Sequence, residues 1–180
     1  TWEASARGLL GLCQLGDVLD VASGDGAVAE LLAPRSRSIT CLDQSERVIG
    51  AAQRRLKRLT NVRFECGDMH ALPFEDNSFD AVLLMNCLTY ASPPRQVVAE
   101  AARVLRDGGR LIGVTLKRHT NERDVQSYNH VNCGFRPRGL RQLLETHNLE
   151  VSCCQVTSRE NRPPHFEVIT FHASATNARA

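Results

Sequence analysis

Short apolar runs alternate with amphipathic stretches and turn residues along most of the chain. An apolar run of about four to eight residues between turn signals predicts a buried strand, whereas a period of about 3.6 residues predicts a helix. Strands and helices that alternate in this way are typical of a parallel sheet with helices on both faces. The apolar runs predict strands at 17–22, 39–42, 62–66, 79–85 and 110–116. The amphipathic stretches predict helices at 2–13, 27–32, 45–59 and 94–105.

The last part of the chain departs from this alternation. Residues 117–135 have weak periodicity and many polar groups, which predicts a cover over the active site. A helix is predicted at 139–147, and two strands at 150–156 and 165–171 follow with no helix between them, as in an antiparallel hairpin. Residues 173–180 predict a frayed tail. The expected fold class is therefore α/β: a doubly wound, mostly parallel seven-stranded sheet with an antiparallel edge hairpin and helices on both faces.

The composition fits one globular domain. Apolar residues make up 42% and charged residues 23% of the 180 positions, close to the averages of soluble globular proteins. The 22 Lys and Arg exceed the 20 Asp and Glu by only two, so the charge gives no case for nucleic acid or an anionic membrane as a partner. No segment reaches the roughly 18 apolar residues of a transmembrane helix. These features predict a single cytoplasmic domain over 1–180, and the lack of an initiating Met before Thr1 suggests a piece of a longer chain.

The seven cysteines are interpreted as reduced packing residues. No Cys-x-x-Cys pair occurs, and an odd number does not fit a closed set of disulfides. Cys41, Cys66 and Cys87 lie in or beside apolar runs, where a thiol behaves as a small hydrophobe. The adjacent Cys153 and Cys154 would point to opposite faces of a strand, which is poor geometry for shared chelation. We therefore expect no site that binds a metal or a metalloid ion through these thiols.

A glycine segment follows the first predicted strand. Gly24-Asp25-Gly26 lies between an apolar strand and a helix, where the backbone can approach a ligand closely. Asp43 closes the second strand, and an acidic group there can accept both hydroxyls of a ribose. These features alone do not separate a nicotinamide cofactor from S-adenosylmethionine, because Gly24-x-Gly26-x-x-Ala29 also satisfies the loose dinucleotide pattern.

Three further features favour S-adenosylmethionine. Asp20 lies inside the end of the first strand, where a carboxylate suits an ammonium group better than a pyrophosphate. Gly67-Asp68-Met69 follows the third strand and offers an acceptor for the amino group of adenine and an apolar flank for its ring. The predicted terminal hairpin is foreign to the plain dinucleotide fold.

Together these segments resemble the class I, Rossmann-like S-adenosylmethionine-dependent methyltransferases, and the resemblance covers nearly the whole chain. One departure is Ala22, where the family usually has Gly, so the backbone there is expected to sit slightly farther from the methionine moiety. The segments that carry the resemblance are Val18-Leu19-Asp20-Val21-Ala22-Ser23-Gly24-Asp25-Gly26, Gly67-Asp68-Met69-His70-Ala71-Leu72-Pro73-Phe74, Phe79-Asp80-Ala81-Val82 and Arg103-Val104-Leu105-Arg106-Asp107-Gly108-Gly109-Arg110-Leu111.

The resemblance implies roles for individual residues. Asp20 and Gly24 would hold the methionyl end, Asp43 the ribose, and Asp68 with Met69 the adenine. Asn86, just past the fourth strand, would lie near the sulfonium. The full set of predicted cofactor-binding residues is Asp20, Ala22, Gly24, Gly26, Asp43, Gln44, Asp68, Met69 and Asn86.

A narrower resemblance concerns the ends of the chain. Trp2-Glu3-Ala4, His130–Phe135 and Thr157–Glu167 are similar to methyltransferase domains fused behind ArsR-type winged-helix repressors. This resemblance implies an upstream DNA-binding domain in the longer chain, and it makes a regulatory role one alternative.

Methyl transfer from a sulfonium needs no covalent enzyme intermediate, so the protein mainly aligns the acceptor, the methyl group and the sulfur and helps to remove a proton. His130 is the predicted catalytic base, with Tyr128 beside it, because both lie in a compact polar patch with Asn132. His119, and His165 with Glu167 as its partner, are further candidates. A purely structural role stays open for each histidine.

Three functions therefore remain open. The first is S-adenosylmethionine-dependent methyl transfer to a small-molecule acceptor. The second is a non-catalytic S-adenosylmethionine sensor that controls an attached DNA-binding domain. The third is a nicotinamide-dependent oxidoreductase. The acceptor itself depends on the shape of the cover and is not encoded in a motif.

Overall fold

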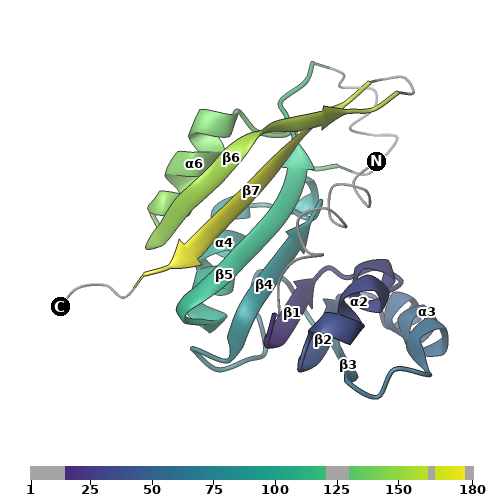
Figure 1. Ribbon diagram of the computed structural model, residues 1–180. Helices are drawn as coiled ribbons and strands as arrows, with labels where there is room; N and C mark the ends of the chain where they lie inside the picture. Colours follow the sequence, from purple (N-terminus) through teal and green to yellow (C-terminus); the bar gives the residue numbers. More distant parts are fainter. Residues whose placement is uncertain (1–14, 121–129, 162–164, 177–180) are drawn as a thin grey trace.

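The computed structural model describes residues 15–120, 130–161 and 165–176, and a seven-stranded sheet runs through its centre (Figure 1). The strand order is β3-β2-β1-β4-β5-β7-β6. The first five strands in this order pair in parallel, and β7 pairs antiparallel to both β5 and β6. The predicted fold class is confirmed. The strands are β1 (Asp17–Val21), β2 (Ser38–Asp43), β3 (Val62–Cys66), β4 (Phe79–Met85), β5 (Leu105–Leu116), β6 (Leu149–Arg159) and β7 (Glu167–Ala175).

Helices cover both faces of this sheet. On one face, alternate residues such as Leu19 and Leu84 pack with apolar side chains of α4 and α6. On the other face, the intervening residues, such as Val18 and Leu83, pack with α2 and with Leu56 of α3. The α-helices are α2 (Ala27–Leu32), α3 (Glu46–Leu56), α4 (Pro94–Val104) and α6 (Pro137–Glu145), and the 3₁₀ turns are η1 (Ala33–Arg35) and η2 (Leu88–Tyr90).

The local sequence explains where two of these helices begin. The Ser45 hydroxyl accepts the amide of Val48 at 3.4 Å, which satisfies one of the free N–H groups at the start of α3. Pro94 occupies the first turn of α4, where its fixed φ and missing N–H cost nothing. The prediction that α3 reaches residue 59 is wrong: the helix ends at Leu56, and the Leu59 amide closes a turn onto the Leu56 carbonyl at 2.8 Å.

The fifth strand differs most from its prediction. β5 begins at Leu105, directly after α4, so the turn predicted at Asp107-Gly108-Gly109 lies within the strand. The register against β4 shifts there, because Phe79 pairs with Leu105 and Ala81 pairs with Arg110. Gly108 has a φ of +69°, which a bulge of this kind readily uses. Residues 106–109 have no partner in the registers with β4 and β7, so the predicted turn residues form this irregularity within the strand.

The terminal hairpin is longer than predicted. β6 runs to Arg159, and β7 continues through Ala173 to Ala175, so a frayed tail starting at 173 is wrong for these residues. β7 has neighbours on both sides: Ser174 pairs with Arg110 of β5 and with Glu150 of β6. This double pairing extends the strand past the limit that its weak apolar pattern suggests. The helix predicted at 2–13 lies outside the described residues.

The strand order reverses at the centre of the sheet. β1 has β2 on one side and β4 on the other, and the chain reaches β4 only after β3 has been added to the far edge. In an open α/β sheet, ligands bind in the crevice beyond the carboxyl ends of the strands at such a switch point. The topology therefore directs attention to the segments that follow β1, β2 and β4.

Candidate cofactor-binding site

A cavity of about 350 Å³ lies at the carboxyl ends of β1, β2, β3 and β4. This volume is within the range of roughly 300–1,000 Å³ that is usual for small-molecule sites. Its walls combine apolar side chains with the polar groups of three strand ends. The lining residues are Ala22, Leu42, Asp43, Gln44, Gly67, Met69, Met85, Asn86, Cys87 and Tyr90.

The segment after β1 turns sharply through left-handed backbone. Ala22, Gly24 and Gly26 have φ values of +55°, +57° and +80°. The φ of Gly26 favours glycine, and a Cβ there would also lie 2.6 Å from Leu56 Cδ1, so the Leu56 side chain would have to move. Ala22 is the exception, because its Cβ makes left-handed backbone unfavourable and faces the cavity. The turn therefore carries strain at the position where the resembling family usually has glycine.

Asp20 is the last but one residue of β1, and its carboxyl group is buried with a residue exposure of 1%. Neither oxygen has a hydrogen-bond partner among the described residues. Burial raises the pKa of this carboxyl to about 7, and the charge of the nearby Asp43 adds to the rise. Burying a carboxyl group without a partner costs free energy, and a cationic ligand would offset that cost by pairing with it.

Asp43 closes β2 and organises the backbone around it. Its Oδ2 accepts the amide of Gly24 at 3.1 Å, and its Oδ1 accepts the amide of Ser45 at 3.0 Å. These two bonds tie the glycine turn to the start of α3. Each carboxylate oxygen has a second lone pair, so Asp43 can still accept two hydroxyl groups from a ligand in the cavity.

Asp68 follows β3 and is held by the residue two positions on. Its Oδ1 accepts a hydrogen bond from the backbone amide of His70 at 2.8 Å and also lies 2.9 Å from His70 Nδ1. These bonds lower the pKa of Asp68, the backbone amide most. On the other side of the ring, His70 Nε2 accepts the amide of Ser92 at 3.1 Å. His70 thus links the loop after β3 to the segment before α4.

A polar stripe on α4 supports the same loop. Gln96, Glu100 and Arg103 lie four and three residues apart, on one face of the helix. Gln96 Nε2 donates to the carbonyl of His70 at 2.9 Å, and Glu100 Oε2 accepts the amide of Leu72 at 2.8 Å. Arg103 donates to Glu100 and to the carbonyls of Leu72 and Phe74, and it pairs with Asp76.

The described part of the predicted cover folds back on η2. The amide of Val131 donates to the carbonyl of Thr89 at 2.9 Å, and Asn132 Nδ2 donates to the carbonyl of Leu88 at 2.9 Å. The ring of His130 meets the ring of Tyr90 edge to face, with centroids 4.9 Å apart. Because Tyr90 lines the cavity, His130 lies directly behind one of its walls.

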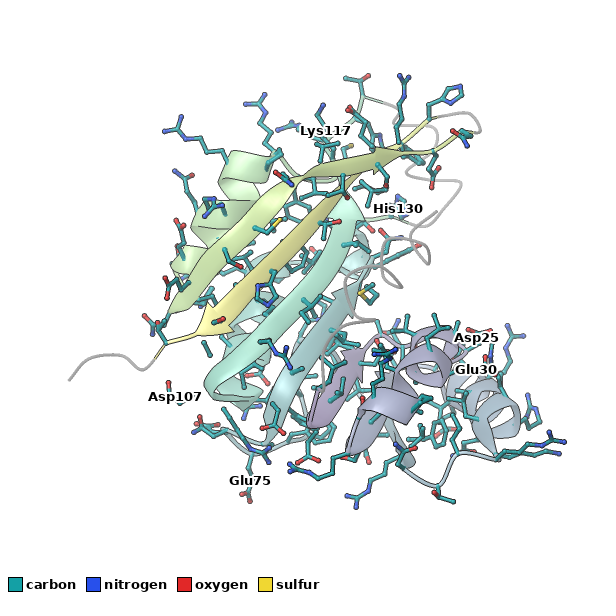
Figure 2. All side chains as sticks on the ribbon, viewed as in Figure 1. Asp25, Glu30, Glu75, Asp107, Lys117 and His130 are labelled. Atoms are coloured by element: carbon teal, nitrogen blue, oxygen red, sulfur yellow. The ribbon has the colours of Figure 1, made fainter. Side chains whose placement is uncertain are left out.

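His130 is a buried histidine. Burial lowers its pKa, and the charge of His119 lowers it further, so the ring is neutral at pH 7. Figure 2 shows His130 at the same end of the sheet as Lys117, with Asp107 and Glu75 at the opposite end. The predicted base is therefore at the cofactor end, although Tyr90 and not His130 is among the residues that line the cavity.

The other candidate bases make contacts away from the cavity lining. The ring of His119 packs against that of Phe166, with centroids 4.6 Å apart. His165 is exposed, with its Nδ1 3.1 Å from the carbonyl oxygen of Glu160. Glu167 pairs with Lys117 at 2.7 Å, not with His165. Tyr128 lies outside the described residues.

The structure thus brings most of the predicted cofactor-binding residues to one place. Ala22, Asp43, Gln44, Met69 and Asn86 line the cavity. The other four, which adjoin lining residues in the sequence or on the same strand end, are Asp20, Gly24, Gly26 and Asp68.

Sequence reasoning missed Cys87, Tyr90 and His70. Cys87 and Tyr90 follow β4, so the rule that ligands bind beyond strand ends could have found them. Burial raises the pKa of the Cys87 thiol to about 12, so this wall of the cavity is a neutral thiol. No pattern in the sequence reveals the role of His70, because its partner Ser92 is 22 residues away.

Two further kinds of site were sought in the part of the chain that the structure describes. In residues 15–120, 130–161 and 165–176, no three His, Cys, Asp or Glu side chains gather closely enough to hold a metal ion. Within the same ranges, no helix has the length and apolar character needed to span a membrane.

Comparisons with known proteins agree with this geometry. The chain is 40% identical over 113 residues to a demethylmenaquinone methyltransferase of Tropheryma whipplei, a match that covers 62% of this chain and 46% of the relative. It is 29% identical over 103 residues to a ubiquinone biosynthesis O-methyltransferase of Coxiella burnetii, covering 57% of this chain and 44% of the relative. The matched regions thus span less than half the length of these curated relatives.

A solved structure shows the same fold. An N-methyltransferase of Bradyrhizobium japonicum in complex with S-adenosyl-L-homocysteine superposes with a TM-score of 0.77 at 19% identity, covering 97% of this chain and 85% of that one. The family described as methyltransferase domain matches residues 19–113, which is more than half of the chain. The chain therefore belongs to the methyltransferase-domain family, whose methyl donor is S-adenosylmethionine.

Proposed function

We propose that the cavity binds S-adenosylmethionine with its methionyl end at β1, its ribose at β2 and its adenine at β3, and that the domain transfers the methyl group to a small molecule. One observation carries this proposal: Asp20, Asp43 and Asp68 stand at or just beyond the carboxyl ends of three neighbouring strands, where Asp43 lines the cavity and the other two adjoin residues that line it. Their order along the sheet matches the order of the ammonium, ribose and adenine groups in the ligand.

The residues fit these groups chemically. The unpaired, buried carboxyl of Asp20 is suited to an ammonium group, which would supply the partner that the protein does not. Asp43 keeps lone pairs for two hydroxyls, and Asp68 keeps Oδ2 for an exocyclic amine. Met69 and Leu42 offer apolar surface to a planar base.

The bound cofactor supplies an electrophilic methyl group on a sulfonium. The protein's part is to hold the acceptor in line with that group and to exclude water. Asn86 and Tyr90, both beyond the end of β4, are placed to form the wall beside the acceptor. His130, neutral at pH 7 and packed against Tyr90, is our proposed base, which would take the proton that the acceptor loses. Tyr128 remains a proposed partner of His130.

A nicotinamide cofactor fits this site poorly. A pyrophosphate at the first turn would meet the buried carboxyl of Asp20, which has no donor to offer a phosphate when it is ionised and repels an anion. The second open function, a sensor joined to a winged-helix domain, uses the same cofactor contacts. It differs in having no room for an acceptor and no transfer of the methyl group.

The test is calorimetry followed by turnover. The wild-type chain is titrated with S-adenosylmethionine, S-adenosylhomocysteine and NAD, and is then incubated with methyl-labelled S-adenosylmethionine and a fractionated metabolite extract. We expect both sulfur ligands to bind, NAD not to bind, and label to appear in a small molecule. Binding without transfer to any fraction would favour the sensor, and NAD binding alone would overturn the proposal.

A further inference from the structure

We propose that His70 is a positioning residue that fixes the carboxylate of Asp68 so that a single oxygen, Oδ2, reads the amino group of adenine. The inference rests on the proposed function, because it assumes that Asp68 faces the base. What it adds is a cause for the base preference: a histidine that the motif does not predict sets the direction of the acceptor.

The hydrogen bonds of the ring determine which nitrogen carries the proton. The Ser92 backbone amide can only donate, so the Nε2 that receives it at 3.1 Å carries no hydrogen. In a neutral imidazole the proton must then be on Nδ1, which donates to Asp68 Oδ1 at 2.9 Å. The contact between His70 and Asp68 is therefore a directed hydrogen bond and not a choice between two tautomers.

Both donors of His70 reach the same oxygen. Oδ1 of Asp68 accepts the backbone amide of His70 at 2.8 Å as well as the ring N–H. Within the described residues, no hydrogen bond uses Oδ2, and the Asp68 side chain remains 60% exposed. One oxygen is thus held by the protein, and the other is presented to a ligand.

The ring and the backbone of His70 are both held in place. Its side chain is only 20% exposed, Nε2 is fixed by Ser92, and the carbonyl of His70 accepts Gln96 Nε2 at 2.9 Å. Glu100 holds the next part of the loop through the amide of Leu72. An acceptor fixed before the ligand arrives loses little conformational freedom on binding, which favours the ligand that matches it.

Two substitutions separate the two ends of the ring. In His70→Asn, a short amide N–H lies near the place of Nδ1–H and preserves the bond to Asp68, while the bond to Ser92 is lost. In His70→Gln, the longer amide places its oxygen near Nε2 and preserves the bond to Ser92, while the donor to Asp68 is lost. A role limited to packing the loop would favour the Gln variant, whereas a positioning role favours the Asn variant.

The experiment measures the affinities of S-adenosylhomocysteine and S-inosylhomocysteine by calorimetry. Inosine has a carbonyl oxygen in place of the amino group, so the ratio of the two affinities reports base reading alone. We expect His70→Gln to lower the wild-type ratio by about two- to tenfold, the range of one hydrogen bond. His70→Asn is expected to keep the ratio within about twofold. An unchanged ratio in His70→Gln, even if the affinities for both ligands fall, would overturn the inference.

Asp68→Asn, measured in the same way, separates this inference from the assignment beneath it. If Asp68→Asn lowers the ratio and His70→Gln does not, Asp68 reads adenine without help from His70, and only the inference fails. If Asp68→Asn leaves the ratio unchanged, the proposed adenine contact fails as well. A measurement on the wild-type chain needs no variant: nitrogen NMR should show the neutral His70 ring protonated at Nδ1, and protonation at Nε2 would contradict the inference.

Discussion

The two sides of the cavity are built in different ways. On the adenosine side, the loop after β3 is held by side chains: Asp68, His70, Gln96, Glu100 and Arg103 all bond to backbone groups or to each other. On the side proposed for the acceptor, the described residues of the cover are joined to η2 and to the sheet by backbone hydrogen bonds. Examples are Val131 to Thr89 at 2.9 Å, Phe135 to Leu116 at 2.9 Å and Arg118 to Phe135 at 2.8 Å.

This difference has a consequence for specificity. Backbone hydrogen bonds do not depend on the identity of the side chains, so the cover can change its residues and keep its path. The adenosine side cannot, because replacing one of its polar side chains leaves its partner unsatisfied. We infer that the side-chain hydrogen bonds around the loop after β3 specify the cofactor. The side chains carried by the cover specify the acceptor.

The largest expected effect lies on the acceptor side. If His130 is the base, His130→Ala should reduce turnover by about 10²–10⁴-fold, the usual contribution of general-base assistance. The affinity for S-adenosylhomocysteine should stay within about twofold, because the three carboxyl groups proposed to hold the cofactor lie at the ends of β1, β2 and β3 and not beside His130. Both quantities are measured on the same preparation, by label transfer and by calorimetry.

His147 provides a matched control for this substitution. Burial also lowers the pKa of His147, but it lies beside a surface cleft that includes Asp107, at the end of the sheet opposite His130 (Figure 2). His147→Ala should leave turnover unchanged. If the two variants lose the same activity, the loss comes from the fold and not from the acceptor site.

The next effect concerns the ribose. Asp43→Ala removes an acceptor of two hydroxyl groups, and bonds to a charged group contribute about 1.5–3 kcal/mol each. The affinity for S-adenosylhomocysteine should fall by at least about tenfold, measured by calorimetry. Because Asp43 also holds the amides of Gly24 and Ser45, the 2′,3′-dideoxy analogue is titrated in parallel. Wild type and variant should bind this analogue more nearly equally; an undiminished gap would show that the loss comes from the backbone turn.

A third effect is on pH dependence. The pKa of Asp20 is about 7 in the fold and has the ordinary value of 3.8 when unfolded. Between these values the folded chain binds more protons than the unfolded chain, so the stability of the unliganded protein falls as pH rises from about 4 to 7. An ammonium ligand favours the ionised carboxylate, so its binding has the opposite trend.

The affinity for S-adenosylhomocysteine should therefore rise by up to about tenfold between pH 6 and pH 8, since one pKa unit corresponds to a factor of ten. Calorimetry at pH 6 in two buffers of different ionisation enthalpy should also show proton release on binding. Asp20→Asn should abolish both effects and bind weakly throughout. Affinity that is flat with pH in the wild type would remove Asp20 from the ammonium site.

A smaller effect tests the side chains that hold the adenosine loop. Arg103→Met removes donors to two carboxylates and two carbonyls, at a side chain that is 31% exposed. We expect a loss of about 1–3 kcal/mol in the free energy of unfolding, measured by urea denaturation. Arg95→Met, on the exposed part of the same helix, should change it by less than about 0.5 kcal/mol. Equal losses would mean that the polar stripe of α4 adds nothing.

The smallest expected effect is a gain. Ala22 has a φ of +55°, which costs a residue with a Cβ about 1–2 kcal/mol, while glycine loses about 0.5–1 kcal/mol more chain entropy on folding. Ala22→Gly should therefore stabilise the fold by about 1 kcal/mol or less, seen as a Tm rise of about 2–4 °C or less. A lower Tm would show that the Ala22 Cβ is needed for packing.

Much of the fold and of the cofactor site follows from local pattern. Strands 62–66 and 79–85 have the predicted bounds; residues 79–85 are a short apolar run, whereas the edge strand 62–66 alternates apolar and charged residues and is not buried. Asp43 and Asn86 could be placed in the site because strand ends in a parallel sheet converge. The start of β5 could not be predicted, since Leu105 pairs with Phe79 of β4 ahead of the Asp107-Gly108-Gly109 irregularity, and no local pattern marks that pairing.

The contacts that connect distant segments could not be predicted from the sequence. His70 is fixed by Ser92, and His130 packs on Tyr90, 40 residues earlier in the chain. A single sequence carries no signal for such pairs, because neither spacing nor periodicity depends on them. This is why the cofactor side was largely predictable, whereas the wall formed by Tyr90 was not.

The most direct test of the central claim is one titration series on the wild-type chain, with S-adenosylhomocysteine and NAD as separate ligands in the calorimeter at pH 8. We predict saturable binding of S-adenosylhomocysteine at one site per chain and no binding of NAD, because the carboxyl groups at the ends of β1, β2 and β3 favour an ammonium, a ribose and an adenine over a pyrophosphate. Binding of NAD with no heat from S-adenosylhomocysteine would contradict the account.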